Sequence, residues 1–330
     1  MTQLRVIAAM LALAGALQIA GSARAQQVYP TRTVNFILPY GAASATDITA
    51  RLFADRLSTL WGKPVVVENR VGGDGLVALN AFVGAHDDHT LFVGPAGSFE
   101  VLPYDQDTLP FDVQRDIVPI VCISEVVLAF AVPASLNIDS LDQLVALARA
   151  EPGKLNAAAA GGISDFLLFG FFKNLGLDVA HVPYRDIMQA PNDLASGRIQ
   201  VLATSLAVPL PLTRAGKLKI LAVSSTQRAP TTPDVPTAVE AGYPALTFES
   251  LNGVFGPRGM PDKLRESIAG DFRKVAESDP IIPKRLGDIG TIMSIRGPAE
   301  FAASVDEQRG QLAAIAKVLG IKAAENASSQ

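Results

Sequence analysis

The sequence has 330 residues, of which 49% are hydrophobic and 18% are charged. This composition excludes an intrinsically disordered chain, and the length exceeds what one hydrophobic core usually organises, so we expect two lobes. The 28 Lys and Arg against 32 Asp and Glu give a net charge of -4, and aromatic residues make up only 6%. A nucleic-acid-binding protein would need a basic stripe or a base-stacking surface, and this composition argues against both.

The N-terminus has the pattern of a secretory signal peptide. Arg5 precedes the uncharged and mostly apolar run Val6–Ala20, which is too short to span a bilayer. Ala23 and Ala25 then form an Ala-x-Ala cleavage site. We expect residues 1–25 to be removed after Ala25, which leaves an exported, soluble protein.

Short apolar runs alternate with amphipathic stretches along the first half of the mature chain. We predict strands at Thr33–Leu38, Pro64–Glu68 and Thr90–Gly94, and a helix at Asp47–Trp61 with apolar residues on one face. The glycine cluster at 72–75 opens a second, short helix. This βαβ order predicts a parallel sheet covered by helices on both faces.

The same order of elements restarts in the middle of the chain. The predicted strands are Leu155–Ala160, Val179–Val182, Ile199–Ala203 and Leu218–Ser224. The predicted helices are Ser140–Ala150, Asp165–Leu175, Ala190–Ser196, Pro261–Ser278 and Pro298–Leu319. This half-chain theme predicts two α/β lobes that face each other.

The single cysteine and the clustered histidines have simple structural interpretations. Cys122 lies in the apolar run Val118–Ser124, where we predict a buried small side chain on a strand. One thiol cannot form a disulfide within its own chain. His86-Asp87-Asp88-His89 has donors for a metal, but it directly precedes a predicted strand and favours a polar turn. His181, at a strand end, is either structural or in contact with a cleft.

Two loops have the same place in the two halves of the chain. Pro39–Asp47 and Ala160–Asp165 each follow a predicted strand and open a helix. Ligands of open α/β sheets bind at such strand ends, and free N–H groups with the helix dipole favour an anion. Ser44 and Asp47 fit a capping box, and Ser164 suits an N-cap. Either loop alone is equally well explained as a capped helix start, but two matching loops favour a shared anion site.

An esterase interpretation fits the sequence poorly. The segment Gly162-Ile163-Ser164-Asp165-Phe166 lacks the second glycine of the Gly-x-Ser-x-Gly nucleophile elbow. His181 follows Ser164 by only 17 positions, with no evident orienting acid after it. No Walker lysine follows a glycine loop, and the cluster at 72–75 is too compact for a dinucleotide fingerprint. Nothing in the sequence requires catalysis.

The whole mature chain resembles the tripartite tricarboxylate transporter receptors, also called the Bug family of periplasmic solute-binding proteins. The stretches that carry the resemblance are Tyr29-Pro30, Pro39-Tyr40, Thr46-Asp47-Ile48-x-Ala50-Arg51, Val65–Arg70 with Gly72 and Gly75, Pro152–Leu155, His181–Tyr184, Asp193-Leu194 and Ala215–Leu218. The most specific is Pro233-Asp234-Val235-Pro236-Thr237 with Glu240-Ala241-Gly242.

The resemblance implies a type II periplasmic-binding-protein fold, with two α/β lobes joined by two crossing strands. Residues 26–127 and 252–330 would form the first lobe, and residues 128–251 the second. Family members hold a small carboxylate between the lobes with backbone amides and ordered waters. The candidate ligand-binding residues in this chain are Tyr40, Ala42, Ala43, Ser44, Thr46, Asp47, Ser98, Gly161, Gly162, Ser164, Tyr184, Arg185 and Ser205.

The chain departs from the family pattern inside both loops. The family usually has Pro-Gly-Gly where this chain has Ala42-Ala43-Ser44. In the second loop, the family usually has Gly-x-Gly-Ser-x-x-His, and this chain has Leu167 in place of the final His. After Tyr184 the family favours Lys-Gly, and this chain has Arg185-Asp186. We expect Leu167, with Phe166, to make one wall of the cleft apolar and to favour aromatic or apolar acids.

These observations predict a periplasmic solute-binding protein that captures a small organic carboxylate and delivers it to a tripartite inner-membrane transporter. We expect a monomer that is not an enzyme and takes no cofactor, no metal and no nucleic acid. The alternative is a carboxylate sensor of the same fold that signals to a membrane receptor. An exported hydrolase is the third and most distant interpretation.

Overall fold

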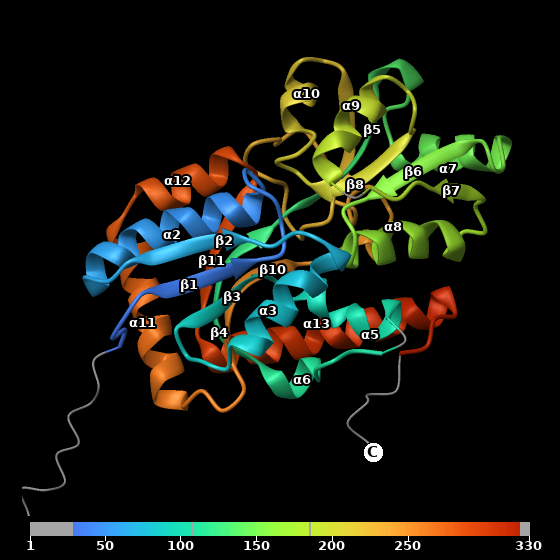
Figure 1. Ribbon diagram of the computed structural model, residues 1–330. Coiled ribbons are helices and arrows are strands. Elements are labelled where there is room, and N and C mark those ends of the chain that lie inside the picture. Colours follow the sequence, from blue (N-terminus) through green and yellow to red (C-terminus); the bar gives the residue numbers. More distant parts are fainter. Residues whose placement is uncertain (1–28, 107, 185, 324–330) are drawn as a thin grey trace, which may run out of the picture.

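The computed structural model describes residues 29–106, 108–184 and 186–323. The predicted signal peptide at 1–25 and the candidate ligand residue Arg185 therefore lie outside the described residues. The described chain forms two α/β lobes, each built on its own sheet (Figure 1).

The first sheet has six strands in the order β11-β4-β10-β3-β1-β2. Its strands are β1 (Val34–Leu38), β2 (Val65–Asn69), β3 (Thr90–Pro95), β4 (Ile117–Val126), β10 (Ser250–Pro257) and β11 (Thr291–Arg296). Its helices are α2 (Ala45–Trp61), α3 (Leu76–Ala85), α4 (Gly97–Glu100), α5 (Leu102–Asp105), α6 (Val113–Asp116), α11 (Asp262–Ser278), α12 (Ile281–Asp288) and α13 (Pro298–Leu319).

The second sheet has five strands in the order β7-β6-β8-β5-β9. Its strands are β5 (Leu128–Pro133), β6 (Leu155–Ala159), β7 (Val179–His181), β8 (Val201–Ser205) and β9 (Leu218–Val223). Its helices are α7 (Leu141–Ala150), α8 (Ile163–Asn174), α9 (Ala190–Ala195) and α10 (Leu210–Arg214).

Both sheets are mixed, which corrects the prediction of a purely parallel sheet. The βαβ segments are parallel as predicted: β1 pairs with β2 and β3, and β6 pairs with β7 and β8. The strands that enter from the other lobe are antiparallel to their neighbours. β10 runs against β3 and β4, and β5 runs against β8 and β9. A strand arriving from the opposite lobe enters from the end where the parallel strands finish, so it must run the other way.

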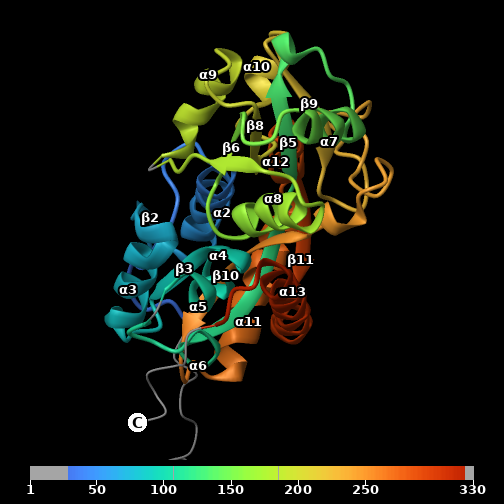
Figure 2. The same ribbon diagram turned by 90° about the vertical axis from the view of Figure 1, so that its right-hand side faces the viewer.

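Two crossings connect the lobes. The chain passes from β4 through Val127 into β5, and it returns from β9 through residues 224–249 into β10 (Figure 2). The carboxyl ends of β1, β3 and β4 therefore face the carboxyl ends of β6, β7 and β8. The exact lobe boundaries given by the sequence stay a prediction.

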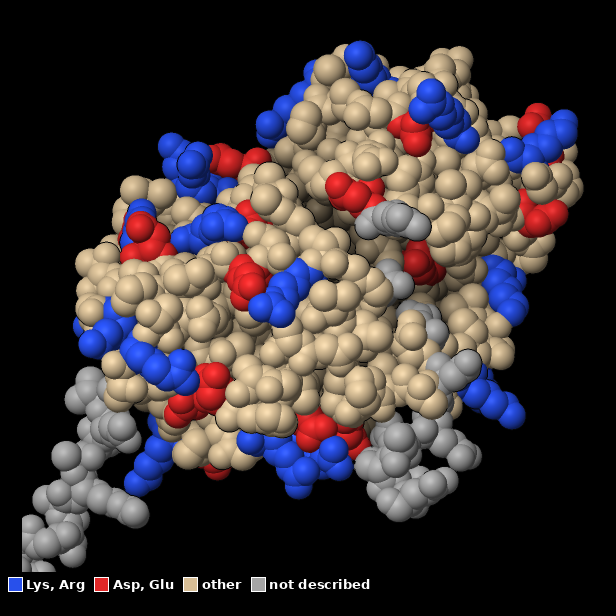
Figure 3. Space-filling view, viewed as in Figure 1, with Lys and Arg blue, Asp and Glu red and all other residues tan. Residues whose placement is uncertain are grey.

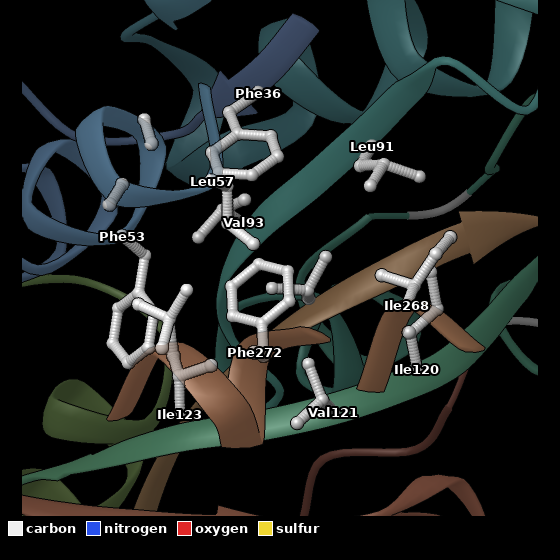
Figure 4. Packing of buried hydrophobic residues seen from close by; sticks show 14 of the residues in the cluster. Phe36, Phe53, Leu57, Leu91, Val93, Ile120, Val121, Ile123, Ile268 and Phe272 are labelled. Atoms are coloured by element: carbon white, nitrogen blue, oxygen red, sulfur yellow. The ribbon is translucent and has the colours of Figure 1, made fainter. Parts of the chain in front are cut away.

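The core of the first lobe fixes α2 and α11 on one face of its sheet. Phe272 of α11 packs against Phe36 of β1 and Phe53 of α2, with ring centroids 6.1 and 5.3 Å apart (Figure 4). All three side chains are fully buried. Cys122 on β4 is also fully buried, as predicted, and burial raises the pKa of its thiol to about 12. The thiol is therefore unreactive at neutral pH.

Candidate ligand-binding site

The loop after β1 begins α2 with a side-chain cap. The Ser44 hydroxyl accepts a hydrogen bond from the Asp47 N–H at 3.2 Å, as a capping box predicts. The return bond differs from that motif, because the Asp47 carboxylate accepts the N–H of Ala43 at 3.0 Å instead of the N–H of Ser44. The loop is thus tied at two successive residues to the first turn of the helix.

Asp47 is buried and already well supplied with donors. Its side chain is 4% exposed and lies 3.0 Å from the guanidinium of Arg51, one turn further along α2. The amide of Asn69, at the end of β2, donates to Asp47 at 2.9 Å and to the Tyr40 carbonyl at 2.8 Å. Burial alone would raise the pKa of Asp47, but the hydrogen bonds from Arg51, Asn69 and Ala43 outweigh it and lower the pKa. Asp47 therefore holds the shape of this loop.

The tip of the same loop is open and has an unusual backbone. Ala43 has a φ of 66°, the left-handed region that glycine adopts more easily. The side chains of Ala42 and Ala43 are exposed, whereas Thr46, in the first turn of α2, is buried. A ligand can therefore approach the backbone at Ala42 and Ala43.

The matching loop of the second lobe is shaped by two glycines. Gly161 and Gly162 have φ of 79° and 53°, and Gly162 is the N-cap of α8. Ser164 is the buried second residue of this helix, so the prediction that Ser164 caps it was wrong. The cap lies earlier because glycine can adopt the backbone that leads directly into Ile163.

The start of α4, directly after β3, lies against the loop of the second lobe. The Cβ that an alanine would add at Gly162 would lie 3.6 Å from the Cα of Ser98, and the Cβ added at Gly97 would lie 3.2 Å from the Cβ of Ile163. The Ser98 hydroxyl donates to the Pro95 carbonyl at 2.7 Å. The lobes therefore meet at small residues, with Ser98 directly beside the glycine loop.

Phe166 and Leu167 pack between the lobes. They are 4% and 2% exposed and share a cluster with Val101 of the first lobe and with Leu312 and Ala316 of α13. Phe166 also contacts the ring of Tyr104, with centroids 5.8 Å apart. The expectation that these two residues form an apolar cleft wall is therefore not supported.

The remaining candidate residues lie on the second lobe. The Tyr184 hydroxyl donates to Asp193 of α9 at 2.8 Å, and burial together with this carboxylate raises the pKa of Tyr184 to about 12. Ser205 is the last residue of β8 and is half-buried. His181 lies 3.5 Å from Asp165 of α8, and Ser164 is buried in the first turn of the same helix.

The topology thus gathers the described candidates at one junction. Tyr40 to Asp47 and Ser98 lie at the facing edge of the first sheet, and Gly161, Gly162, Ser164, Tyr184 and Ser205 lie at that of the second. The structure brings Ser98 against Gly162, whereas the Asp47 and Tyr184 side chains bond within their own lobes. Among the described residues in the face of Figure 3, Asp and Glu border this junction, and few Lys and Arg do. Such a site would bind an anion mainly through backbone N–H groups.

Sequence reasoning missed the side chains that brace the site. Asn69 and Arg51 hold Asp47, and the i,i+4 spacing of Asp47 and Arg51 was a signal that could have identified that pair. No local pattern could have identified the bidentate pair of Glu100 and Arg309, whose atoms lie 2.8 and 3.0 Å apart, because 209 positions separate them.

Two features away from the junction do not add to the site. A hollow of about 510 Å³, lined by Ser135, Asn192, Lys217 and neighbours, lies at the opposite end of the second sheet from Gly161. The turn at 86–89 is a hydrogen-bonded network in which Thr31 N–H donates to His89 Nε2 at 3.1 Å and Asp87 pairs with Arg32 at 3.0 Å. These bonds fit the polar turn that the sequence predicts. Among the described residues, no helix has the length and apolarity to cross a bilayer.

The model of a known family matches most of the chain. Residues 49–320 match the tripartite tricarboxylate transporter family receptor. A Pseudomonas sp. protein from a tcbD-tcbE intergenic region is 31% identical over 81% of this chain and 81% of its own length. Protein BugT of Bordetella pertussis is 29% identical over 94% of this chain and 93% of its own length.

Solved structures resemble the whole two-lobed fold. MatC of Rhodopseudomonas palustris with bound malate superposes with a TM-score of 0.79 at 26% identity, covering 87% of this chain and 99% of MatC. A second R. palustris protein, solved with adipate, has a TM-score of 0.79 at 28% identity and covers 90% of this chain and all of its own. The periplasmic binding protein BugD has a TM-score of 0.78 at 25% identity, covering 89% and 99% of the two chains. The type II periplasmic-binding-protein fold predicted from the sequence is thereby confirmed.

Proposed function

This chain belongs to the tripartite tricarboxylate transporter family receptors, and from that premise we propose that it is a periplasmic binding protein for a small organic carboxylate. The acid would be held between the lobes and delivered to a tripartite inner-membrane transporter. The protein would act by binding and presenting its ligand, without a chemical step.

The observation that carries this proposal is the pair of helix starts at the junction. The loops before α2 and α8 lie at facing sheet edges, and an N-terminal helix end attracts a carboxylate through its N–H groups and dipole. Two structural neighbours were solved with malate and with adipate, both aliphatic dicarboxylates. Since Phe166 and Leu167 are engaged between the lobes, the structure removes our reason to favour aromatic acids.

A thermal-shift screen tests the ligand class. The protein lacking residues 1–25 would be scanned with malate, adipate, citrate, acidic amino acids and aromatic acids. An acid present at a hundredfold excess over its dissociation constant stabilises the folded form by about 2.7 kcal/mol, which raises the melting midpoint of a chain this size by several degrees. If no carboxylate shifts the midpoint, the ligand class is wrong.

A matched pair of variants tests the location. Ala42→Leu enlarges an exposed side chain at the tip of the first loop, and Ala146→Leu makes the same change on the outer helix α7. We expect calorimetry to show weaker binding of the hit only for Ala42→Leu. Equal affinity of both variants would place the ligand elsewhere.

Loss of uptake tests the partner. Cells that lack this gene should fail to take up the acid identified in the screen. Returning the gene should restore uptake only when the membrane subunits of the transporter are present. Uptake that persists in the deletion strain would contradict delivery to a transporter.

A further inference from the structure

Helix α13 connects the two lobes in addition to the two crossings. It runs from beneath the first sheet to a position under α8 of the second lobe (Figures 1 and 2). Any opening of the junction must therefore either move α8 relative to α13 or bend α13.

The N-terminal half of α13 is fixed to the first lobe. Phe301 and Val305 lie in the core of that lobe, and Phe301 fills the space that a side chain at Gly253 would need. Arg309 pairs with the carboxylate of Glu100 on α4, which is only 4% exposed. This half can move only with the first sheet.

The C-terminal half of α13 is fixed to α8. Leu312 and Ala316 pack in the same cluster as Phe166 and Leu167 of α8, and Val101 and Tyr104 of the first lobe border that cluster. A Cβ at Gly170 of α8 would lie only 2.9 Å from Ile315, so the two helices approach closely there. The ammonium group of Lys173 also donates to the carbonyl of Leu319 at the end of α13.

Gly310 lies between these two halves, directly after Arg309. It is exposed, and a Cβ at this position would meet nothing within 4 Å, so no packing constraint accounts for the missing side chain. Glycine weakens a helix interior, and helices bend most readily where glycine interrupts them. Gly310 therefore lies between the pairing of Arg309 with Glu100 of the first lobe and the residues of α13 that pack against α8.

We propose that Gly310 is a flexible joint in α13, and that residues 312–319 move with α8 when the lobes open and close. The proposal rests on the proposed binding function, since opening and closing is what a ligand held between lobes requires. With this joint, α13 would be a third moving connection between the two lobes, and the stiffness of α13 would regulate their motion.

Spin-label distances in the unliganded protein test which part of α13 moves. Asn80→Cys on α3, Ala146→Cys on α7 and Lys317→Cys on α13 all change exposed residues. The buried Cys122, with its raised pKa, stays unlabelled. We expect a broad distance distribution for positions 80 and 146, an equally broad one for 80 and 317, and a narrow one for 146 and 317. A broad 146–317 distribution with a narrow 80–317 distribution, or narrow distributions for all three pairs, would overturn the proposal.

Two alanine substitutions test Gly310 itself. Gly310→Ala should narrow the 80–146 distribution. Gly270→Ala is the matched control, because Gly270 is also an exposed glycine inside a helix, α11, and its added Cβ would also meet nothing within 4 Å. Both variants should raise the melting midpoint, but only Gly310→Ala should change the distances. Distances that respond to neither variant, or equally to both, would refute the joint.

The binding function can fail independently of the joint. Calorimetry with malate and adipate reports on binding, whereas the label distances are measured without ligand. Altered distances in Gly310→Ala without binding of any acid would leave the joint standing and remove the function. Binding of an acid, together with label distances that do not change in Gly310→Ala, would support the binding function and refute the joint.

Discussion

Replacing Asp47 by asparagine should weaken the hydrogen bonds that support the first ligand loop, while the size of the side chain at position 47 stays nearly the same. In the folded protein, the carboxylate accepts hydrogen bonds from Ala43 N–H, Asn69 and Arg51 and is almost completely buried. An asparagine keeps one acceptor oxygen but turns an NH₂ group toward donors. The variant therefore loses the charge and leaves at least one buried donor without a partner.

The expected loss of stability follows from these contacts. Hydrogen bonds to a charged group contribute about 1.5–3 kcal/mol each, and an unsatisfied buried donor costs about 1–3 kcal/mol. Arg51 is half exposed, so its ion pair adds only about 0.5 kcal/mol. Because asparagine retains some of the bonds, we expect a net loss of about 3 kcal/mol, which lowers the melting midpoint by about 5–10 °C. Asp55→Asn, at an exposed position of the same helix, should change the midpoint little.

The pH dependence separates the charge from the shape. Since the hydrogen bonds lower the pKa of folded Asp47, its contribution is complete above the pKa of an unfolded aspartate, which is about 4, and is lost as the pH falls through the lower folded pKa. The difference in melting midpoint between wild type and Asp47→Asn should therefore be full at pH 7 and shrink below pH 4. A difference that stays constant down to pH 3 would show that the charge of Asp47 has no part in holding the loop.

Three other substitutions test the contacts that surround the site. Arg309→Ala leaves the buried Glu100 carboxylate unpaired and should lower the free energy of unfolding by about 3 kcal/mol at pH 7. Because burial already raises the pKa of Glu100, this loss should diminish as the pH falls and the carboxyl is protonated. Melting curves between pH 4.5 and 7.5 would show the change. Gly253→Ala places a Cβ 2.2 Å from the Phe301 ring and 2.9 Å from the Val121 carbonyl, so chemical denaturation should show a loss of about 3 kcal/mol or more, against a gain for Gly270→Ala. Arg296→Gln removes the guanidinium that lies 2.6 Å from Glu125 and 3.2 Å from Glu249, one acid beside each crossing, and should broaden the 80–146 label distances; an unchanged distribution would contradict a hinge role for Arg296.

Local patterns were sufficient for elements whose core is made by neighbours in sequence. The predicted strand Thr33–Leu38 and helix Asp47–Trp61 correspond to β1 (Val34–Leu38) and α2 (Ala45–Trp61), because their apolar residues repeat at the strand and helix periods. The tail helix Pro298–Leu319 has the predicted bounds of α13. These elements carry their own boundary signals, such as Ser44 before α2 and Gly320 after α13.

The crossings and the supports of the site could not be predicted in this way. β5 and β10 are buried along most of their length, so they lack the alternation that reveals a half-exposed strand. Their antiparallel direction depends on which lobe they come from, which no local window contains. The N-cap of α8 was missed because a serine seemed a better cap than a glycine, and the positive φ of Gly162 becomes evident only in the folded loop.

The strand order of the first sheet also has a consequence for how the chain is made. β10 is inserted between β3 and β4, so the strands nearest the N-terminus cannot form one continuous sheet until residue 257 has left the ribosome. Until then, β3 and β4 lack their shared neighbour, and the early part of the chain has only the short β2-β1-β3 ribbon on which to build. Late completion of a sheet slows folding, because contacts between distant segments must wait for both partners. For a protein that is exported as proposed, this delay would keep the nascent chain extended enough to thread through a secretion channel before it folds.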